Sequence, residues 1–542
     1  MNSIPHVPPP VNEPVLSYAP GTPERDRLKG LVKDLFSRRI EIPLVIGGRE
    51  IHTDKTVDAV MPHCHRHVLA TVHQAGAAEV EQAIAAAREA WRDWSTWTFE
   101  RRAAVFLKAA DLLAGKHRAA VNAATMLGQS KTAHQAEIDA ACELIDFWRF
   151  NVHYAEWLYA QQPVSAPGVW NTMEYRPLEG FVYAVTPFNF TSIGGNLSTS
   201  PAIMGTTVVW KPAATAAYSN YFLMKVLEEA GLPPGVVNFV PGPASEVTRV
   251  TLAHRHLGGV HFTGSTEVFQ SLWRQVATNL STYADYPRLV GETGGKDFIV
   301  AHASADVDAL AAAMVRGAYE YQGQKCSAAS RAYIPDAIWP AVKERVLAML
   351  ERVKVGDPAD FRSFMGAVID RKAFEKIRGY IETAKADAKS RIVFGGGTDD
   401  RDGWFVQPTL LQTDDPKALT MCEEIFGPVL SVYVYPAKRF DETLRLVDET
   451  SPYALTGAIF ARERQAVEQA RAALRFAAGN FYVNDKPTGA VVGQQPFGGA
   501  RASGTNDKAG SYLNLIRWVS ARSMKENFVP PTDFTYPFMT EP

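Results

Sequence analysis

The sequence predicts an α/β fold in which helices wind around a parallel sheet and a second α/β unit follows. Short apolar runs alternate with helical patterns over about a hundred residues from position 181, as a wound parallel sheet requires. A second alternation extends from 297 to 500. The 542 residues, 46% hydrophobic and 21% charged, are enough for two or three domains with a large core.

The first part of the chain is predicted to be helical between two extended arms. Residues 1–25 are rich in proline and polar side chains, which indicates a poorly structured arm. Apolar residues then recur at three- to four-residue spacing, which indicates helices. We expect these helices at 76–94, 100–113 and 135–158. Residues 161–178, which include Pro163, Pro167 and Gly168, should form an extended arm that leaves the globule.

Short apolar strands and a helix with a clear end signal make up the predicted sheet region. We expect strands at 181–186, 206–210, 236–240, 259–263 and 288–290. The helix at 218–230 should end at Gly231, because Pro233 and Pro234 follow it. The tail after residue 510 is predicted to be extended and aromatic.

The composition excludes several classes of protein. Lys and Arg number 56 against 58 Asp and Glu, a net charge of −2 without a basic run, so we expect no nucleic-acid partner. The 4 cysteines lack the spacing of a disulfide framework, which favours a reducing compartment. No apolar run approaches the roughly 18 residues of a membrane span, and the first twenty residues resemble neither a signal peptide nor a mitochondrial presequence. We therefore expect a cytoplasmic protein without a membrane partner.

Cys326 is the candidate nucleophile. It lies among small side chains in the run 323–331, and Glu292 lies 34 positions upstream in the glycine-rich run 291–296. A thiolate can attack a carbonyl carbon, and a carboxylate can then activate the water that cleaves the acyl-enzyme. The alternative is a buried structural thiol. We assign that role to the remaining cysteines, which are Cys64, Cys142 and Cys422.

One run of residues resembles a metal site. Cys64 lies between His63 and His65, and His67 follows, so a strand would place the histidines on one face. Ligand sets usually come from two segments, and no second cluster accompanies this run. We expect no metal.

Weaker signals indicate a nucleotide cofactor. The Gly-x-Gly-x-x-Gly fingerprint is absent. Gly264 instead follows a predicted strand and a helix starts at Ser265 or Thr266, where free amides favour a phosphate. Lys211 stands at the carboxyl end of a strand, where ligands of open α/β sheets bind. Taken alone, each feature is better explained without a cofactor, by a plain strand-to-helix turn with a hydroxyl N-cap and by an exposed strand-end lysine. Likewise, the Asn189 amide suits a developing oxyanion, although most loop asparagines only cap a turn.

Six short motifs occur in one order along the chain. They are Pro-Phe-Asn at 187–189, Trp-Lys-Pro at 210–212, Phe-Thr-Gly-Ser at 262–265, Gly-Glu-Thr-Gly-Gly-Lys at 291–296, Gly-Gln-Lys-Cys at 323–326 and Glu-Glu-Ile-Phe-Gly-Pro at 423–428. In this order they resemble the aldehyde dehydrogenase superfamily, and the resemblance runs from about residue 40 to the C-terminus. Within it the chain is similar to the branch of stand-alone L-glutamate γ-semialdehyde dehydrogenases. The stretches that carry this similarity are 135–147, 179–181, 194–197, 323–328 and 492–507.

The resemblance implies an aldehyde dehydrogenase fold with three parts. These are a Rossmann-like NAD-binding domain with the N-terminal arm at 1–160 and 180–289, a catalytic α/β domain at 290–505, and a small β oligomerisation arm and tail at 161–179 and 506–542. It implies oxidation of L-glutamate γ-semialdehyde to L-glutamate with NAD, the second step of proline degradation. The exposed strands of the arm and tail indicate exchange with another subunit and a homodimer.

The resemblance also implies roles for individual residues. Cys326 attacks the aldehyde, Asn189 and the Cys326 backbone N–H hold the oxyanion, and Glu292 activates the hydrolytic water. The implied cofactor contacts are Thr186, Lys211, Gly264, Ser265, Thr266, Glu267, Val268, Glu424 and Phe426. The small-molecule substrate contacts Ser327, Gly489, Ala490, Phe497 and Phe190, with the amides of Gly489 and Ala490 on its carboxylate.

Some points stay open in the sequence. Ala214 stands three positions after Lys211, where many NAD-preferring relatives carry an acidic residue, so use of NADP is open. Glu143 lies on a predicted helix that can approach the thiol, in a catalytic or a structural role. The alternative functions are oxidation of another small aldehyde and a catalytically silent, crystallin-like scaffold. The intact set of Cys326, Glu292, Asn189 and Lys211 disfavours the scaffold.

Overall fold

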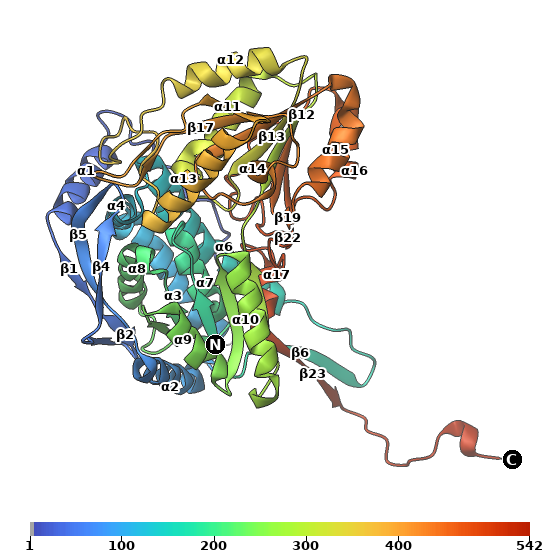
Figure 1. Ribbon diagram of the computed structural model, residues 1–542. Helices are drawn as coiled ribbons and strands as arrows, with labels where there is room; N and C mark the ends of the chain where they lie inside the picture. Colours follow the sequence, from blue (N-terminus) through green and yellow to red (C-terminus); the bar gives the residue numbers. More distant parts are fainter. Residues whose placement is uncertain (1–4, 542) are drawn as a thin grey trace.

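Two seven-stranded sheets dominate the computed structural model, which describes residues 5–541 (Figure 1). The first sheet contains all five strands that the sequence predicts between 181 and 290, and these five run parallel. Two short antiparallel strands extend one edge. In spatial order its strands are β11 (Arg288–Glu292), β10 (Leu257–Thr263), β7 (Phe181–Val185), β8 (Thr207–Lys211), β9 (Val237–Phe239), β2 (Leu44–Ile46) and β3 (Arg49–Ile51).

The second sheet lies in the later half of the chain and is parallel except at one edge, where its first strand is antiparallel. In spatial order its strands are β14 (Ser390–Phe394), β17 (Thr409–Thr413), β18 (Val429–Tyr435), β13 (Ala329–Pro335), β12 (Asp297–Ala301), β20 (Thr456–Phe460) and β21 (Asn480–Val483). The central strands β8 and β12 are buried along their whole length, as expected where helices cover both faces of a parallel sheet.

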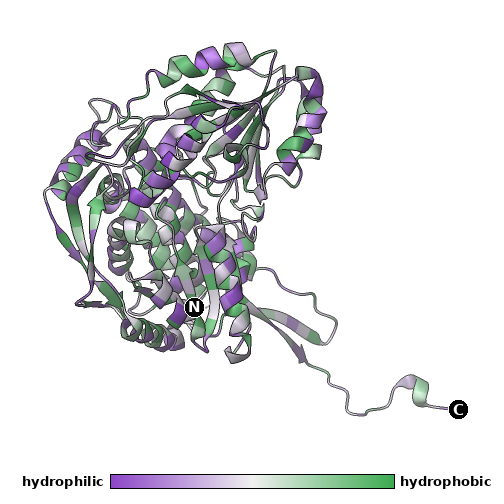
Figure 2. Ribbon diagram, in the orientation of Figure 1, coloured by the Kyte–Doolittle hydropathy of each residue, from purple (hydrophilic) through white to green (hydrophobic). Residues whose placement is uncertain are grey.

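Helices pack on both sheets. Those of the first half are α1 (Pro23–Phe36), α2 (Ala77–Trp94), α3 (Phe99–Leu112), α4 (Arg118–Gln129), α5 (Ala133–Ala136), α6 (Leu144–Tyr159), α7 (Thr191–Ile203), α8 (Ala217–Ala230), α9 (Ala244–Ala253) and α10 (Thr266–Thr278). Those of the second half are α11 (Val307–Tyr319), α12 (Trp339–Leu350), α13 (Arg371–Ala386), α14 (Leu419–Cys422), α15 (Phe440–Glu449), α16 (Arg464–Ala473) and α17 (Tyr512–Leu515). Figure 2 shows hydrophobic residues concentrated along the strands at the centre of the molecule.

The helix predictions are largely confirmed. The predicted spans 76–94 and 100–113 correspond to α2 and α3, and Gly231 ends α8 with a left-handed φ of 95°. The predicted helix 135–158 is wrong in one respect, because a π-helical segment (η2, Glu137–Glu143) separates α5 from α6. Periodicity does not reveal a π segment, since the apolar positions continue across it.

The prediction of a poorly structured arm at 1–25 is wrong for its described part. Residues 5–22 form no helix or strand, but they lie fixed on the globule, and α1 already begins at Pro23. Tyr18 is buried, and its hydroxyl donates to Glu137 Oε2 at 2.7 Å. Tertiary contacts therefore order this segment without regular structure, which local composition does not reveal. Residues 1–4 lie outside the described residues.

The extended arms pair with each other inside the chain. β6 (Val169–Pro177) and β23 (Val519–Asn527) form a two-stranded antiparallel ribbon that projects from the globule, and the C-terminal tail continues beyond it (Figure 1). The prediction of an extended tail after 510 is wrong for its start, where α17 forms and Trp518 is buried. The extended, aromatic character begins only later, with exposed Phe528, Phe534, Tyr536 and Phe538.

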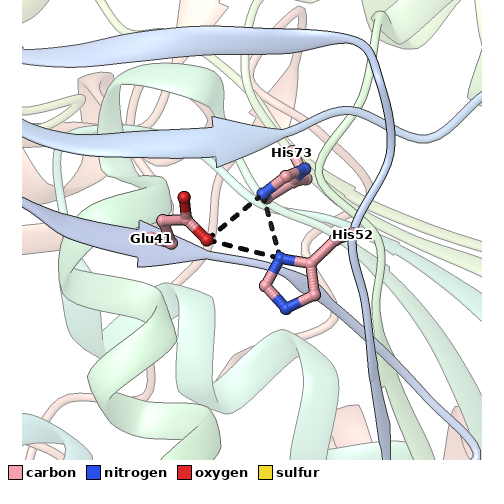
Figure 3. Close-up of side chains that lie close together, drawn as sticks. All are labelled: Glu41, His52 and His73. Atoms are coloured by element: carbon pink, nitrogen blue, oxygen red, sulfur yellow. Dashed lines mark hydrogen bonds and ion pairs between the residues drawn. The ribbon is translucent and has the colours of Figure 1, made fainter.

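A small third sheet carries Glu41 and His73, which together with His52, just after β3 of the first sheet, form the only group of side chains in residues 5–541 with the spacing of metal ligands (Figure 3). Its strands are β1 (Ile40–Ile42), β5 (Cys64–His73) and β4 (Thr56–Met61). Nδ1 of His52 lies 3.1 Å from Nε2 of His73 and 3.5 Å from Glu41 Oε2. Nδ1 of His73 lies 2.9 Å from the Thr53 backbone nitrogen and 2.8 Å from the Thr53 carbonyl oxygen. These contacts already engage both nitrogens of the His73 ring, and Glu41 and His52 are exposed, so we infer no metal from this group.

The histidines around Cys64 do not converge either. His65 stacks on Trp404, and His67 stacks on Phe36. His63 lies buried with Nδ1 at 3.1 Å from the Ser130 hydroxyl. The expected common face therefore does not form. No helix within the described part of the chain is both long and apolar enough to cross a membrane.

Candidate active site

The carboxyl ends of four parallel strands bring the predicted residues of the first sheet to one edge. Thr263 pairs with Glu292, and Val185 pairs with Lys211, so these positions lie on neighbouring strands at the same level. The loop after β7 carries Asn189 from this edge. Strand ends of an open α/β sheet are where ligands bind, because the free backbone groups and loops meet there.

The thiol of Cys326 reaches this edge from the second sheet. It lies in the loop between η5 (Glu320–Gly323) and β13, is 8% exposed, and its Sγ lies 3.4 Å from Glu292 Oε1. The two residues that the sequence separates by 34 positions are thus in direct contact. A thiol and a carboxylate at this distance can exchange a proton.

The backbone before the thiol is fixed by unusual geometry. Tyr321 and Gln322 have left-handed φ values of 52° and 56°, which bulky residues adopt only when their surroundings impose it. The Gln322 side chain donates to the carbonyls of Ser130 and Ala367, at 3.0 and 2.8 Å. Gly323 follows with a φ of 66°, and a Cβ there would lie 2.3 Å from the Gly427 carbonyl. This loop therefore holds Cys326 in one position.

Burial controls the proton affinities of the pair. Burial, then the neighbouring Glu292 carboxylate, raises the pKa of Cys326 well above its usual range. Burial also raises the pKa of Glu292 to about 7, although its contacts with Cys326 and Lys508 act in the opposite direction. The thiol is therefore protonated at rest, and the adjacent carboxylate is a base poised near neutral pH.

Asn189 lies beside the thiol loop. Its side chain is 3% exposed, and Nδ2 donates to the Gln324 carbonyl at 3.0 Å. This bond uses one hydrogen of the amide and orients the other. The Asn189 side chain is thus a rigid hydrogen-bond donor beside Gln324, two positions before Cys326.

A cavity of about 410 Å³ opens at the thiol and collects all five residues predicted to contact the substrate. They are Ser327, Phe190, Gly489, Ala490 and Phe497. The Ser327 hydroxyl lies 2.7 Å from that of Thr488, and Gly489 has a left-handed φ of 93° that turns the following loop. Phe190 and Phe497 supply apolar walls.

Several further residues line this cavity. Lys325 belongs to the motif at 323–326, whereas Lys486, His134 and the N-terminal residues Asn12, Glu13 and Val15 carry no sequence signal. Behind Phe190, the buried Lys131 pairs with Asp139 at 2.7 Å and its Nζ lies 4.2 Å from the Phe190 ring centroid. Charge pairing inside a core has no local pattern, so only the fold reveals it.

Glu143 also lines the cavity. The Ser192 hydroxyl donates to its Oε2 at 2.8 Å, and burial, then nearby Asp139, raises its pKa to about 8. A mostly neutral carboxyl with a fixed hydrogen bond is suited to a structural role, although it also adds polarity to the cavity wall.

The residues predicted to hold a cofactor line the strand edge beside the thiol, and their chemistry fits a dinucleotide. Lys211 is 8% exposed, and burial alone lowers its pKa to about 8 without a paired carboxylate in residues 5–541. The alternative of an exposed strand-end lysine is therefore wrong. A buried amine without a partner matches ribose hydroxyls, which can accept its hydrogen bonds.

The start of α10 provides the predicted amides. The Ser265 hydroxyl caps the helix by accepting from the Val268 N–H at 3.3 Å. The N–H groups of Thr266 and Glu267 belong to the first turn, where helices lack internal acceptors and bind phosphate. The Thr266 hydroxyl donates to the Ala502 carbonyl at 3.1 Å, which fixes this helix end against the later half of the chain.

The remaining predicted cofactor residues lie around the thiol loop and the strand edge. Glu424 Oε1 accepts from the Gly295 N–H at 3.0 Å, and a Cβ at Gly294 would lie 2.3 Å from this carboxylate. Phe426 has a left-handed φ of 58° and contacts the Phe188 ring edge-on. Thr186 Oγ1 accepts from the Trp210 indole N–H at 3.0 Å.

Comparison with known proteins identifies the family. A model of the aldehyde dehydrogenase family matches residues 50–519. The chain belongs to the aldehyde dehydrogenase family. This aldehyde dehydrogenase is 54% identical over 540 residues to "Delta-1-pyrroline-5-carboxylate dehydrogenase, mitochondrial" of Dictyostelium discoideum, with 99% of this chain and 97% of that protein covered. The human protein of the same name is 50% identical over 529 residues, covering 97% of this chain and 94% of that protein.

A solved structure confirms the predicted fold of this aldehyde dehydrogenase. The Delta-pyrroline-5-carboxylate dehydrogenase from Mycobacterium tuberculosis bound with NAD matches with a TM-score of 0.97 and 56% identity, and all of both chains is covered.

Proposed function

We propose that this aldehyde dehydrogenase oxidises L-glutamate γ-semialdehyde to L-glutamate and reduces NAD. One observation carries the proposal: Cys326, which is in contact with Glu292, lines a cavity that Gly489 and Ala490 also line. The contact between Cys326 and Glu292 supplies the chemistry for oxidation of an aldehyde. The backbone amides of Gly489 and Ala490 supply a site for an α-carboxylate. Relatives that are half identical over nearly the whole chain carry the name of this activity.

The first step forms a bond between sulfur and carbon. Glu292 Oε1, 3.4 Å from Sγ, takes the thiol proton as Cys326 attacks the aldehyde carbon and its carbonyl oxygen becomes an oxyanion. The Asn189 amide and the Cys326 N–H hold this oxyanion. Loss of one such donor costs about 10²–10³ in rate.

The second step converts the thiohemiacetal to a thioester. A bound NAD supplies the hydride acceptor, at its nicotinamide ring. Glu292 first releases the thiol proton to solvent and then accepts a proton from water, while hydroxide adds to the thioester carbon. The carbon–sulfur bond breaks to release the acid, and the proton on Glu292 returns to the Cys326 thiolate. The raised pKa of Glu292, about 7, suits both proton transfers at neutral pH.

The cavity selects the substrate by its head group. The Ser327 hydroxyl and the N–H groups of Gly489 and Ala490 bind the carboxylate, since amides in a glycine turn hold an anion without a charged side chain. Phe190 and Phe497 pack on the aliphatic chain.

The cofactor site lies at the strand edge. Lys211 takes the adenosine ribose, the segment Gly264–Val268 the pyrophosphate, and Glu424 the nicotinamide ribose, with Phe426 and Thr186 beside it. Ala214 is exposed and offers no acidic barrier to a ribose phosphate. Comparison of KM for NAD and NADP tests whether NAD is preferred.

The test is production of NADH, followed by absorbance, with 1-pyrroline-5-carboxylate and with simple aliphatic aldehydes. We expect turnover with the first and a much lower kcat/KM with the others. The reverse order would assign the enzyme to another aldehyde, and no turnover with any would indicate a silent scaffold.

We also propose that the protein is a homodimer, that its domains have separate functions in NAD binding and catalysis, and that it is located in the cytoplasm. The exposed ribbon of β6 and β23 supports a subunit contact, because each of its strands has a free edge in a two-stranded sheet. The segments 1–160 and 180–289 bind NAD, 290–505 carries catalysis, and 161–179 with 506–542 forms the arm and tail. A monomer by light scattering at micromolar concentration, or recovery with mitochondria on fractionation, would contradict the respective proposals.

A further inference from the structure

Three residues of the N-terminal arm, residues 11–16, lie at the substrate cavity. Asn12, Glu13 and Val15 line it together with Cys326 and the loop that contains Gly489. Since no helix or strand occurs in 5–22, side-chain contacts with distant segments hold this arm in place.

Asn12 is the link between the arm and that loop. Its Nδ2 donates to Asp146 Oδ2 on α6 and to the Val492 carbonyl, both at 2.8 Å. Its Oδ1 accepts from Gln494 Nε2 at 2.9 Å. Both hydrogens and the oxygen of the Asn12 side-chain amide are thus used. Asn12 therefore joins α6 to the loop 489–495, and it lies 480 positions before Val492 in the sequence.

The loop 489–495 has no other hydrogen bonds to the rest of residues 5–541. Its remaining bonds are internal, from the N–H groups of Gln494 and Gln495 to the Val491 carbonyl and from the Val491 N–H to Gln495 Oε1. Asn12 therefore makes every hydrogen bond that fixes this loop from outside. The loop carries the two amides that face the head group of the substrate.

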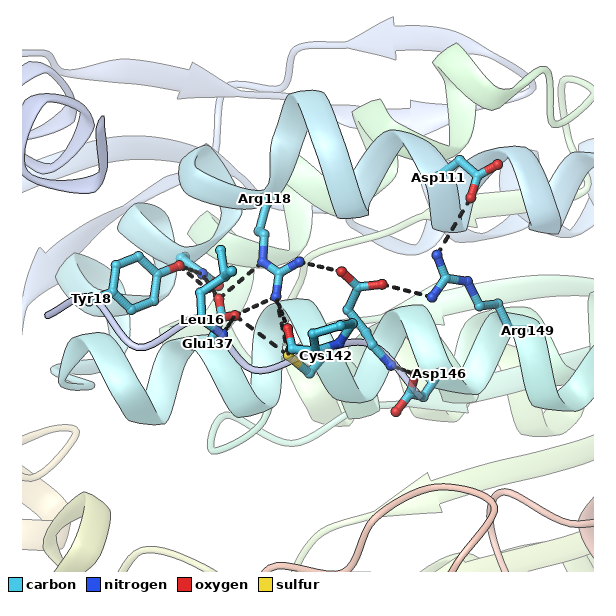
Figure 4. A network of polar contacts seen from close by, with 11 residues as sticks. Leu16, Tyr18, Asp111, Arg118, Glu137, Cys142, Asp146 and Arg149 are labelled. Carbon is cyan, nitrogen blue, oxygen red and sulfur yellow. Dashed lines mark hydrogen bonds and ion pairs between the residues drawn. The ribbon is translucent and has the colours of Figure 1, made fainter. Parts of the chain in front are cut away.

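The arm itself is anchored strongly. Glu13 pairs with Arg149 at 2.7 Å and with Arg118, and its N–H donates to Asp146 Oδ1 at 2.7 Å. Arg118 continues to Glu137, which also accepts from the Leu16 N–H at 2.8 Å (Figure 4). Because this network is mostly buried, it holds Asn12 in a fixed position.

We propose that Asn12 is a positioning residue that holds the loop 489–495 so that the N–H groups of Gly489 and Ala490 meet the α-carboxylate of the substrate. This inference rests on the proposed function and extends it to substrate choice. The arm gives the enzyme its preference for an aldehyde with an amino-acid head group, while the chemistry at Cys326 does not depend on it.

The test compares two aldehydes in Asn12→Ala and Asn12→Asp. With glutamate semialdehyde we expect KM to rise about tenfold or more while kcat changes little, since hydrogen bonds of about 1 kcal/mol each are lost. With propanal, which has no head group, kcat/KM should stay within threefold. Asn12→Asp keeps the side-chain size but places a carboxylate against Asp146 and the Val492 carbonyl, so it should be at least as impaired as Asn12→Ala. If Asn12 only fills space, Asn12→Asp will behave as the wild type.

Two further variants complete the test. Gln494→Ala removes the contact from the loop side and should reproduce a raised KM for the semialdehyde, even if the Asn12 variants fail to fold. Val11→Ala, at a 71% exposed position of the same arm, should match the wild type. An unchanged KM in Gln494→Ala and in the folded Asn12 variants, or an equal loss on both aldehydes, overturns the proposal. Lack of semialdehyde turnover by the wild type refutes instead the proposed function.

Discussion

Substitution of Glu292 by Gln tests the chemistry of the site most fully. Glutamine keeps the shape of the side chain beside Cys326 but cannot accept a proton. Glu292 is the carboxylate in contact with the thiol, at 3.4 Å, and Lys508 lowers its pKa against the larger effect of burial. No other side chain in residues 5–541 forms a hydrogen bond with the Cys326 thiol.

The expected loss of kcat in Glu292→Gln follows from the role of Glu292 as a general base. A positioned general base contributes about 10²–10⁴ in rate, so kcat should fall by that factor, which corresponds to about 3–5 kcal/mol in the activation free energy. The wild-type rate should rise as pH increases through about 7, because Glu292 must lose its proton to act as a base and burial raises its pKa to about 7. In Glu292→Gln this inflection should be absent.

Steady-state NADH production across pH 5.5–9, combined with titration of NAD binding, measures both effects. We expect unchanged NAD affinity together with the loss of rate. A variant that keeps the wild-type kcat and the same inflection near pH 7 would refute the assignment of Glu292 as the base.

Three further outcomes follow from buried charges and from one backbone angle. Glu292→Gln should unfold at a higher temperature than the wild type above pH 7 but not near pH 4, because a carboxyl with a raised pKa loses stability as pH rises from its unfolded value to about 7. Lys211→Met should raise KM for NAD at least tenfold and raise the unfolding temperature at pH 7, since burial of the lone amine lowers its pKa to about 8 and disfavours its charged form; a lowered unfolding temperature would show that Lys211 has a partner. Gly231→Ala should cost about 1 kcal/mol of unfolding free energy in denaturant titration without a change in kcat, because its φ is 95°; an unchanged midpoint would contradict this.

Short sequence patterns were sufficient to predict much of the fold and the residues that lie around the thiol. The strand that ends at Glu292 and the strand that ends at Lys211 are short apolar runs with helical segments between them, so their parallel pairing follows from general rules. The helix end at Gly231 follows from the glycine and the prolines after it. These features depend on residues close together in the chain.

Features that depend on distant contacts could not be predicted in this way. Asn12 and Val492 meet over 480 positions, and a proline-rich segment gives no sign that it will line a cavity. The π segment 137–143 occurs within helical periodicity that hides it, and Lys131, the buried partner of Asp139, lies in the connection between α4 and α5. The part of the cavity lining that comes from the N-terminal arm therefore needed the structure, whereas a contact between Cys326 and Glu292 was expected from the sequence.

Peptide mapping by mass spectrometry after rapid quench of Glu292→Gln with NAD and glutamate semialdehyde tests the central claim most directly. We predict a glutamyl adduct on Cys326, which forms slowly without the base for the thiol and persists without the base for hydrolysis. We also predict that Cys326→Ala forms no adduct and no NADH while it still binds NAD. Normal turnover by Cys326→Ala, or an adduct on a different residue, would contradict the account.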